Sequence, residues 1–179
     1  LVVSDVVFAF WLRHVLEPSQ RSVDYGSNAA KDVFIRALQE AYSKWTATSK
    51  TSFLQRVQDL FAQFGNETVL LDHKTARLPR FGAITSYHSG SNGSSYVVAN
   101  DENRRWCCFV HEGAIDERAI SAFEDFCRKQ NPRPIRKVLI ANDIIDHNAK
   151  VCAKQAGMWV WVINDLNLLC LLYNQPTLD

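Results

Sequence analysis

Hydrophobic segments alternate with turn residues through the middle of the chain, between residues 81 and 113. Three segments there are rich in Val, Ile, Tyr, Trp and Phe, which favour a pleated surface, and they cover residues 81–88, 95–99 and 105–111. Gly, Asn, Ser and Asp fill the two intervening stretches and suit tight turns. The pattern therefore predicts a meander of three antiparallel strands.

Helices and strands alternate after the meander. Asp116 is predicted to cap the first helix, Gly157 to end the second, and Asn164 with Asp165 to cap the last. Two continuous apolar runs between these helices are typical of buried strands. The predicted helices run from Asp116 to about residue 130, over 146–156 and over 166–173, and the predicted strands cover 138–143 and 158–163.

Before the meander the apolar spacing is mainly helical. Ser52 or Thr51 is a predicted cap, and the apolar stripe that follows it is strongly amphipathic. The predicted helices cover residues 1–16, 29–45 and 53–64, a loop covers 46–51, a short strand covers 67–72, and a basic loop covers 73–80.

This order of elements predicts the fold class. A strand–helix–strand unit that follows a meander requires a mixed sheet with a right-handed crossover, covered by helices. We therefore expect an α/β fold with a mixed sheet of about five or six strands flanked by helices. Residues 51–179 form this predicted domain, and residues 1–50 form a helical N-terminal extension.

Composition adds little beyond a globular character. Hydrophobic residues make up 47%, charged residues 22%, and the formal net charge is +1, so charge alone indicates no partner. No apolar run reaches the roughly eighteen residues that span a bilayer, and no signal peptide is recognisable, so we expect a cytoplasmic protein without a membrane partner. The chain begins with Leu1 in a core-like pattern, which leads us to expect a piece of a longer protein. The five cysteines contain no CxxC pair and are predicted to be buried free thiols.

The element order is similar to the restriction-endonuclease-like fold of the PD-(D/E)XK nuclease superfamily, with an αβββαβαβ core. The stretch from Asn148 to Tyr173 resembles the last helix–strand–helix of Mrr-type nucleases. The positions that carry this likeness are Ala149, Ala153, Gly157, Val160 and Leu169.

A second resemblance concerns the N-terminal stretch DVVFAFWLRHVLEP. Its Asp5, Phe10, Trp11 and Arg13 match a D-x-x-x-x-F-W-x-R pattern that leads into the nuclease-like C-terminal domain of archaeal-type AAA/STAND ATPases. This resemblance implies an ATPase domain upstream in the same chain as a partner.

The nuclease superfamily places one acidic residue on the second meander strand and a D/E-x-K on the third. Two carboxylates there hold the divalent metal that activates water. The matching positions here are Ser94 or Ser95 and residues 109–111, which carry neither a carboxylate nor a Lys. The sequence therefore predicts a pseudo-nuclease with no catalytic residues and no cofactor. An alternative is a displaced Mg²⁺ or Mn²⁺ site formed by Asp72, Asp101 and Glu112, although acids at turns need no such explanation.

Basic residues gather in three places along this nearly neutral chain. They could contact phosphates, or they could be a solvated loop and a helix end where cations complement the helix dipole. The candidate nucleic-acid-binding residues are Lys74, Arg77, Arg80, Arg104, Arg105, Arg128, Lys129, Arg133, Arg136 and Lys137.

Three functions remain open from the sequence. The first is a catalytically inactive nuclease-like module of a larger ATPase, which binds DNA or a partner protein. The second is an active Mg²⁺- or Mn²⁺-dependent DNA nuclease with displaced ligands. The third is a structural or regulatory interaction domain, and the oligomeric state is open in all three.

Overall fold

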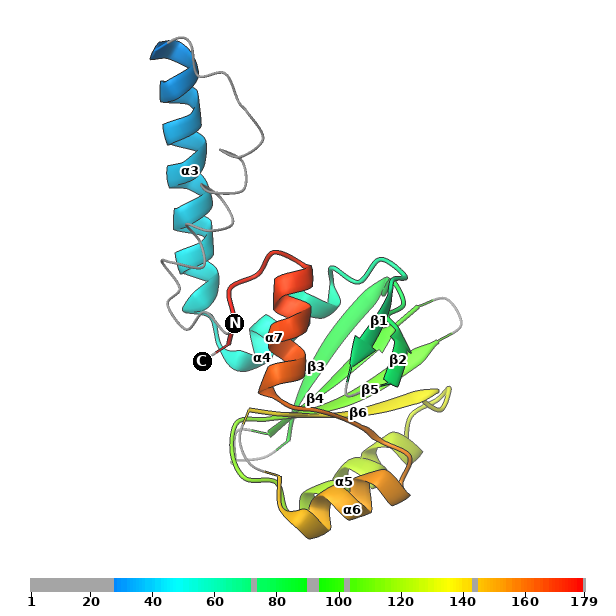
Figure 1. Ribbon diagram of the computed structural model, residues 1–179. Helices are drawn as coiled ribbons and strands as arrows, with labels where there is room; N and C mark the ends of the chain where they lie inside the picture. Colours follow the sequence, from blue (N-terminus) through cyan, green and yellow to red (C-terminus); the bar gives the residue numbers. More distant parts are fainter. Residues whose placement is uncertain (1–27, 72–73, 90–93, 102–103, 143–144, 179) are drawn as a thin grey trace. The chain divides into compact units, whose positions relative to one another are not determined.

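The computed structural model describes residues 28–71, 74–89, 94–101, 104–142 and 145–178 (Figure 1). The chain divides into two compact units. One comprises Ser52–Leu169, and the other combines Leu1–Thr51 with Cys170–Asp179. The predicted helix over residues 1–16 lies outside the described residues.

A mixed five-stranded sheet is the centre of the Ser52–Leu169 unit, with the strand order β3-β4-β5-β6-β7. The predicted meander forms its antiparallel part, and two strands parallel to β5 complete it. This confirms the predicted α/β class with a mixed sheet. The strands are β3 (Ala83–Ser89), β4 (Ser94–Asn100), β5 (Arg105–His111), β6 (Arg136–Ala141) and β7 (Trp159–Trp161).

A separate two-stranded antiparallel sheet precedes the meander. Its strands are β1 (Thr68–Leu71) and β2 (Lys74–Arg77). The predicted loop over residues 73–80 was therefore partly wrong, because half of that segment pairs with β1. Backbone pairing to a neighbouring strand outweighs the weak strand propensity of its Lys and Ala.

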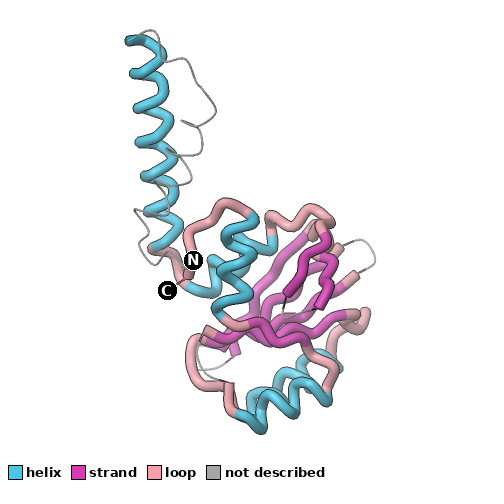
Figure 2. Tube along the Cα trace, viewed as in Figure 1, coloured by secondary structure: helices cyan, strands magenta, loops and turns pink. Residues whose placement is uncertain are grey.

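Two helices, α5 (Glu117–Arg128) and α6 (His147–Gln155), lie side by side on one face of the five-stranded sheet (Figure 2). Both begin where the sequence predicts a helix. The Asp116 carboxylate accepts the N–H of Ala119 at 2.8 Å, and Asp146 accepts those of Asn148 and Ala149. Each carboxylate satisfies amides that would otherwise lack a partner in the first turn.

The core on the face that α5 and α6 cover is formed by alternate residues of the central strands and by the inner sides of both helices. Every member is at most 9% exposed. Tyr96, Val98, Cys107, Phe109, Ile115, Ile120, Phe123, Cys127, Leu139, Ala141, Ala149, Ala153 and Met158 make up this cluster.

The opposite face of the sheet carries an aromatic core centred on Trp106. Helix α4 (Phe53–Phe61), capped by Ser52 as predicted, brings Phe61 to 6.5 Å from the Trp106 ring. Phe81 lies 5.5 Å from the same ring in an edge-on arrangement, as Phe61 does. Edge-to-face packing of large rings stabilises a core beyond the area that it buries.

The remaining helices differ from the sequence predictions at their ends. α7 (Ile163–Leu172) begins earlier than predicted, so Asp165 lies in its first turn and accepts the N–H of Val162 at 3.0 Å. α3 (Asn28–Ser49), in the other unit, extends through most of the predicted loop over residues 46–51. Its polar last turn is held by side chains that return to the backbone, such as Thr48 Oγ1 to the carbonyl of Lys44 at 3.0 Å.

Candidate functional site

The strand register defines two opposite ends of the five-stranded sheet. At one end Ser94 of β4 pairs with His111 of β5, and we call this the Ser94–His111 end. At the other end Asn100 pairs with Arg105, and the neighbouring β6 begins there with Arg136; we call this the Arg105 end. The predicted functional residues divide between these two ends.

The Ser94–His111 end includes the positions where the nuclease resemblance expects an acidic residue, near Ser94 or Ser95, and a D/E-x-K over residues 109–111. In that alignment Phe109 stands at the acidic position and His111 at the Lys position. The Ser94 hydroxyl lies 3.0 Å from Nδ1 of His111, and the two groups share a hydrogen bond. The His111 ring stacks on Phe109 with their centroids 5.8 Å apart. On the other face of β4, Ser95 and His88 share a bond of 3.3 Å. The structure thus pairs Ser94 with His111, the expected Lys position, and the expected acidic position on β5 carries the ring of Phe109.

These residues do not fit a Mg²⁺ ion. Mg²⁺ requires hard oxygen ligands and is usually held by one or two carboxylates. Ser94 supplies a neutral hydroxyl, and His111 supplies an imidazole nitrogen whose Nδ1 is already bonded to that hydroxyl. Within the described ranges, no three His, Cys, Asp or Glu side chains are grouped so that they could hold a metal ion.

The structure does not bring together Asp101 and Glu112, two members of the alternative ligand set of Asp72, Asp101 and Glu112. Asp101 directly follows β4 at the Arg105 end, whereas Glu112 directly follows β5 at the Ser94–His111 end. Along a seven-residue strand such as β5 this separation is about 20 Å, far beyond the reach of one ion. Asp72 lies outside the described residues. Sequence proximity to strand ends misled the prediction because the ends belong to opposite sides of the sheet.

Arg105 has a structural role at its end of the sheet. Its Nε donates to Oδ1 of Asn100 at 2.8 Å, and its Nη1 donates to the carbonyls of Asn131 and Pro132 at 2.7 and 3.3 Å. The backbone of Arg105 also accepts the N–H of Ile135 at 2.9 Å. This residue therefore secures the loop between α5 and β6 against the sheet.

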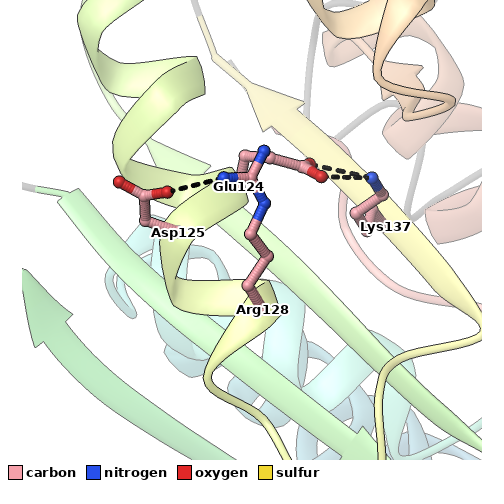
Figure 3. A network of polar contacts seen from close by, with 4 residues as sticks. All are labelled: Glu124, Asp125, Arg128 and Lys137. Carbon is pink, nitrogen blue, oxygen red and sulfur yellow. Dashed lines mark hydrogen bonds and ion pairs between the residues drawn. The ribbon is translucent and has the colours of Figure 1, made fainter.

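Three more of the predicted cations have partners within the protein. Lys137 donates to both carboxylate oxygens of Glu124, at 2.8 and 3.0 Å, and Arg128 pairs with Asp125 at 3.3 Å (Figure 3). Arg136 lies 3.8 Å above the Trp159 ring, an arrangement that stabilises the guanidinium by its attraction to the π face. Partial burial lowers the pKa of Arg136, so this contact also offsets a desolvation cost.

Exposed cations remain around the Arg105 end. Lys129 caps the C-terminus of α5, Arg133 follows in the loop that Arg105 secures, and both side chains are exposed. Arg104 is half-buried in the turn before β5. Exposed Arg80 lies two residues before Gly82, whose N–H donates to the carbonyl of Asn100 at 2.8 Å. We call Arg80, Arg104, Lys129 and Arg133 the basic rim.

The two predicted cations on the β1–β2 hairpin stand apart from the rim. Arg77 is exposed at the end of β2, and Lys74 begins that strand. Their strand pairs with β1 and not with the five-stranded sheet. The structure assigns them a place on the hairpin only.

The cysteines described by the structure are free thiols and belong mainly to the core, as predicted. Cys107 of β5 and Cys127 of α5 share a hydrogen bond, which lowers the pKa of Cys107 and raises that of Cys127. Burial raises the pKa of Cys108 well above its ordinary value. A deeply buried thiol that stays protonated is a poor nucleophile, which argues for packing as the role of Cys108.

The Ser94–His111 pair is the feature that sequence reasoning missed. The backbone bond from the N–H of Asp101 to the carbonyl of Arg104 fixes the register of β4 and β5, and the polar turn residues 100–103 were the signal in the sequence that the two strands pair in this way. Counting back from that turn places residue 94 opposite residue 111.

Comparison of the chain with protein-family models, with curated proteins and with solved structures found no match. In the part of the chain that the structure describes, no helix has the length and apolar character needed to cross a membrane. The fold and the two ends of the sheet thus define an α/β protein with a mixed sheet and a basic rim at one end.

Proposed function

We propose that this chain is a nuclease-like module that binds the phosphate backbone of nucleic acid at the basic rim and does not cleave it. The observation that carries the proposal is the gathering of three exposed cations and the half-buried Arg104 at one end of the sheet of an otherwise nearly neutral chain. Cationic side chains that neutralise phosphates supply most of the affinity of binding without sequence preference.

The arrangement of these cations supports a binding surface. Arg104, Lys129 and Arg133 come from a turn, a helix end and a loop that Arg105 ties to the sheet. A loop that is already held in place loses little conformational entropy when it binds a ligand, so the entropic cost of binding through its cations is small. Asp101 lies in the same turn as Arg104 and reduces the local positive charge without cancelling it.

The lack of cleavage follows from the donors at the Ser94–His111 end. Ser94 or Ser95 and Phe109 stand where the resemblance expects the two carboxylates, and His111 stands where it expects the Lys, so these residues do not fit the divalent metal of the superfamily. The proposed association with an upstream ATPase domain rests on Asp5, Phe10, Trp11 and Arg13, which lie outside the described residues.

Fluorescence anisotropy with labelled single- and double-stranded DNA, across a series of salt concentrations, tests the proposal. We expect binding that weakens steeply with salt. In Lys129→Glu/Arg133→Glu the affinity should fall at least tenfold, and the slope of log affinity against log salt should become shallower by about one for each lost phosphate contact. Incubation of the same DNA with Mg²⁺ or Mn²⁺ should leave it intact.

A matched control uses the opposite end of the sheet. Arg118 lies in the first turn of α5 and Lys150 lies on α6, and both side chains are exposed. Arg118→Glu/Lys150→Glu makes the same change in net charge, and we expect a much smaller loss of affinity. Equal losses of affinity in the two double variants would show that binding depends on the net charge of the chain and not on the basic rim. Anisotropy that does not change with protein concentration at low salt would refute nucleic-acid binding and favour a protein-interaction domain.

A further inference from the structure

In the described part of the chain, the outer edge of β3 has no paired strand, no charged Lys, Arg, Asp or Glu and no proline to protect it. β3 pairs with β4 on one side, and within the described residues no strand pairs with its other side. Its sequence, AITSYHS, contains no Lys, Arg, Asp, Glu or Pro across seven residues. Natural sheets usually protect such edges with charges, proline, bulges or short strands. An uncharged edge of this length is suited to pairing with another strand.

The register shows which backbone groups face outwards. The N–H of Asp101 donates to the carbonyl of Arg104 at 2.8 Å, which makes these two residues a hydrogen-bonded pair between β4 and β5. Alternate residues of an antiparallel strand direct their backbone groups to opposite neighbours. The backbone N–H and C=O groups of Tyr96 and Val98 in β4 therefore bond to β3, not to β5.

The same alternation applies to β3. Tyr87 and Thr85 are the partners of Tyr96 and Val98, so their backbone groups point inwards to β4. The backbone groups of Ile84, Ser86 and His88 consequently point away from the sheet. The side chains of Thr85, Tyr87 and His88 are exposed, which agrees with an open edge.

We propose that the β3 edge pairs with β3 of a second copy of this chain, antiparallel about a two-fold axis at Ser86, to form a continuous sheet across the dimer. The outward residues then form the hydrogen-bonded pairs, with Ser86 opposite Ser86 and Ile84 opposite His88 of the second copy. Each pair exchanges two backbone bonds.

Self-complementarity is the argument for a second copy as the occupant. The two-fold axis places Thr85 of each copy opposite Tyr87 of the other copy. These are non-hydrogen-bonded cross-strand pairs, in which the side chains lie closer together than in hydrogen-bonded pairs. Pairs of an aromatic and a β-branched residue stabilise antiparallel strands, and no like charges meet across this axis. Tyr87, which is 47% exposed, lies with its ring centroid 5.9 Å from that of Phe126 on α5, so its ring is on the face of the sheet that Thr85 of the second copy would share.

Sedimentation velocity over a range of concentrations tests the proposal with the full 179-residue chain. We expect a concentration-dependent dimer. Ser86→Pro removes an outward N–H that β4 does not use, and proline is tolerated at edge strands. This variant should weaken dimerisation at least tenfold while its circular dichroism is unchanged, and Ser86→Ala should dimerise as the unaltered chain does.

A charge exchange makes the test independent of proline. Thr85→Lys/Tyr87→Lys places lysines opposite lysines, and Thr85→Glu/Tyr87→Glu places carboxylates opposite carboxylates. Each double variant should be monomeric alone, and an equimolar mixture should form the heterodimer. A chain that stays monomeric at every concentration, or a dimer that neither the proline nor the charged variants weaken, would overturn the proposal.

Discussion

Ser94 and His111 face each other across β4 and β5, and the Ser94 hydroxyl lies 3.0 Å from Nδ1 of His111. The two side chains project to the same face of the sheet, because directly opposite residues of an antiparallel pair share a face. A pair of carboxylates at these two positions would have their Cβ atoms about 5 Å apart, which is close enough to share one divalent cation. The strand register therefore holds these two positions close together, and a hydroxyl and an imidazole occupy them in place of carboxylates.

Ser94→Asp/His111→Glu should create a divalent-cation site at this end of the sheet. Two carboxylates close together repel each other and gain stability when a cation binds between them. We expect Mn²⁺ to raise the thermal unfolding midpoint of the double variant, measured by differential scanning fluorimetry, and to leave that of the unaltered chain unchanged.

Ser94→Asn/His111→Gln is the control for that prediction, since it keeps the side-chain shapes and removes the charges. Its midpoint should not respond to Mn²⁺. A response in the amide variant, or none in the carboxylate variant, would contradict the view that only ligand chemistry is missing.

Lys137 and Glu124 should show measurable coupling in a double-mutant cycle. The ion pair is bidentate, with side chains 21% and 23% exposed, so solvent screens it less than a surface pair. We expect Lys137→Met and Glu124→Gln each to lower the free energy of unfolding, with a coupling energy of about 1 kcal/mol from urea denaturation.

The Arg128–Asp125 pair supplies the comparison for this cycle. Its side chains are 66% and 63% exposed, and its coupling should be several-fold smaller. Lys137→Met/Glu124→Gln should also bind DNA as the unaltered chain does, since an internally paired lysine is not free for a phosphate. Weaker DNA binding by that variant would show that Lys137 contacts a phosphate despite its pairing with Glu124.

Local chemistry made much of the fold predictable. The strands of the meander were recognisable because β-branched and aromatic runs are separated by Gly and Asn turns, α5 because Asp116 precedes it as a cap, and α6 because Gly157 ends it. β2 was missed because a four-residue strand with charged residues forms only through its pairing with β1. Propensity does not contain that tertiary information.

The basic residues show a similar limit. The sequence grouped Arg128, Lys129, Arg133, Arg136 and Lys137 as one cluster because they lie within ten residues. The structure gives two of them partners on another element, since Lys137 pairs with Glu124 and Arg136 lies over Trp159. A charge cluster in a sequence therefore predicts where cations are, and only the fold decides which of them remain available to a ligand.

Gly157 should be costly to replace, for a reason that concerns the backbone alone. It ends α6 with φ +69°, and Met158 N–H donates to the carbonyl of Ala153 at 2.9 Å just beyond it. A Cβ at this position would have no atom within 4 Å. We expect Gly157→Ala to lower the free energy of unfolding by about 1 kcal/mol through strain in the left-handed region, and Gly157→Asn to cost less.

Gly82→Ala is the matched change at a position without positive φ. An added Cβ there would meet only the carbonyl oxygen of Asn100, at 3.9 Å. The substitution should be neutral or slightly stabilising in urea denaturation, because it reduces the entropy of the unfolded chain. A larger cost at residue 82 than at residue 157 would refute the backbone explanation.

Cys108 should make the protein less stable in alkaline solution. Its pKa is raised above the ordinary value first by burial and second by the neighbouring Cys107, so the folded state keeps the proton after the unfolded state has lost it. The free energy of unfolding is then unaffected at neutral pH and falls as the pH rises above about 8.5, by up to about 1.4 kcal/mol per pH unit for one thiol. Urea denaturation at neutral pH and at about pH 10 measures this slope, and Cys108→Val should reduce it.

Cys152→Val, at a half-buried position on α6, is the control and should change the slope less than Cys108→Val does. An unchanged alkaline slope in Cys108→Val would show that other groups, not this buried thiol, limit stability at high pH.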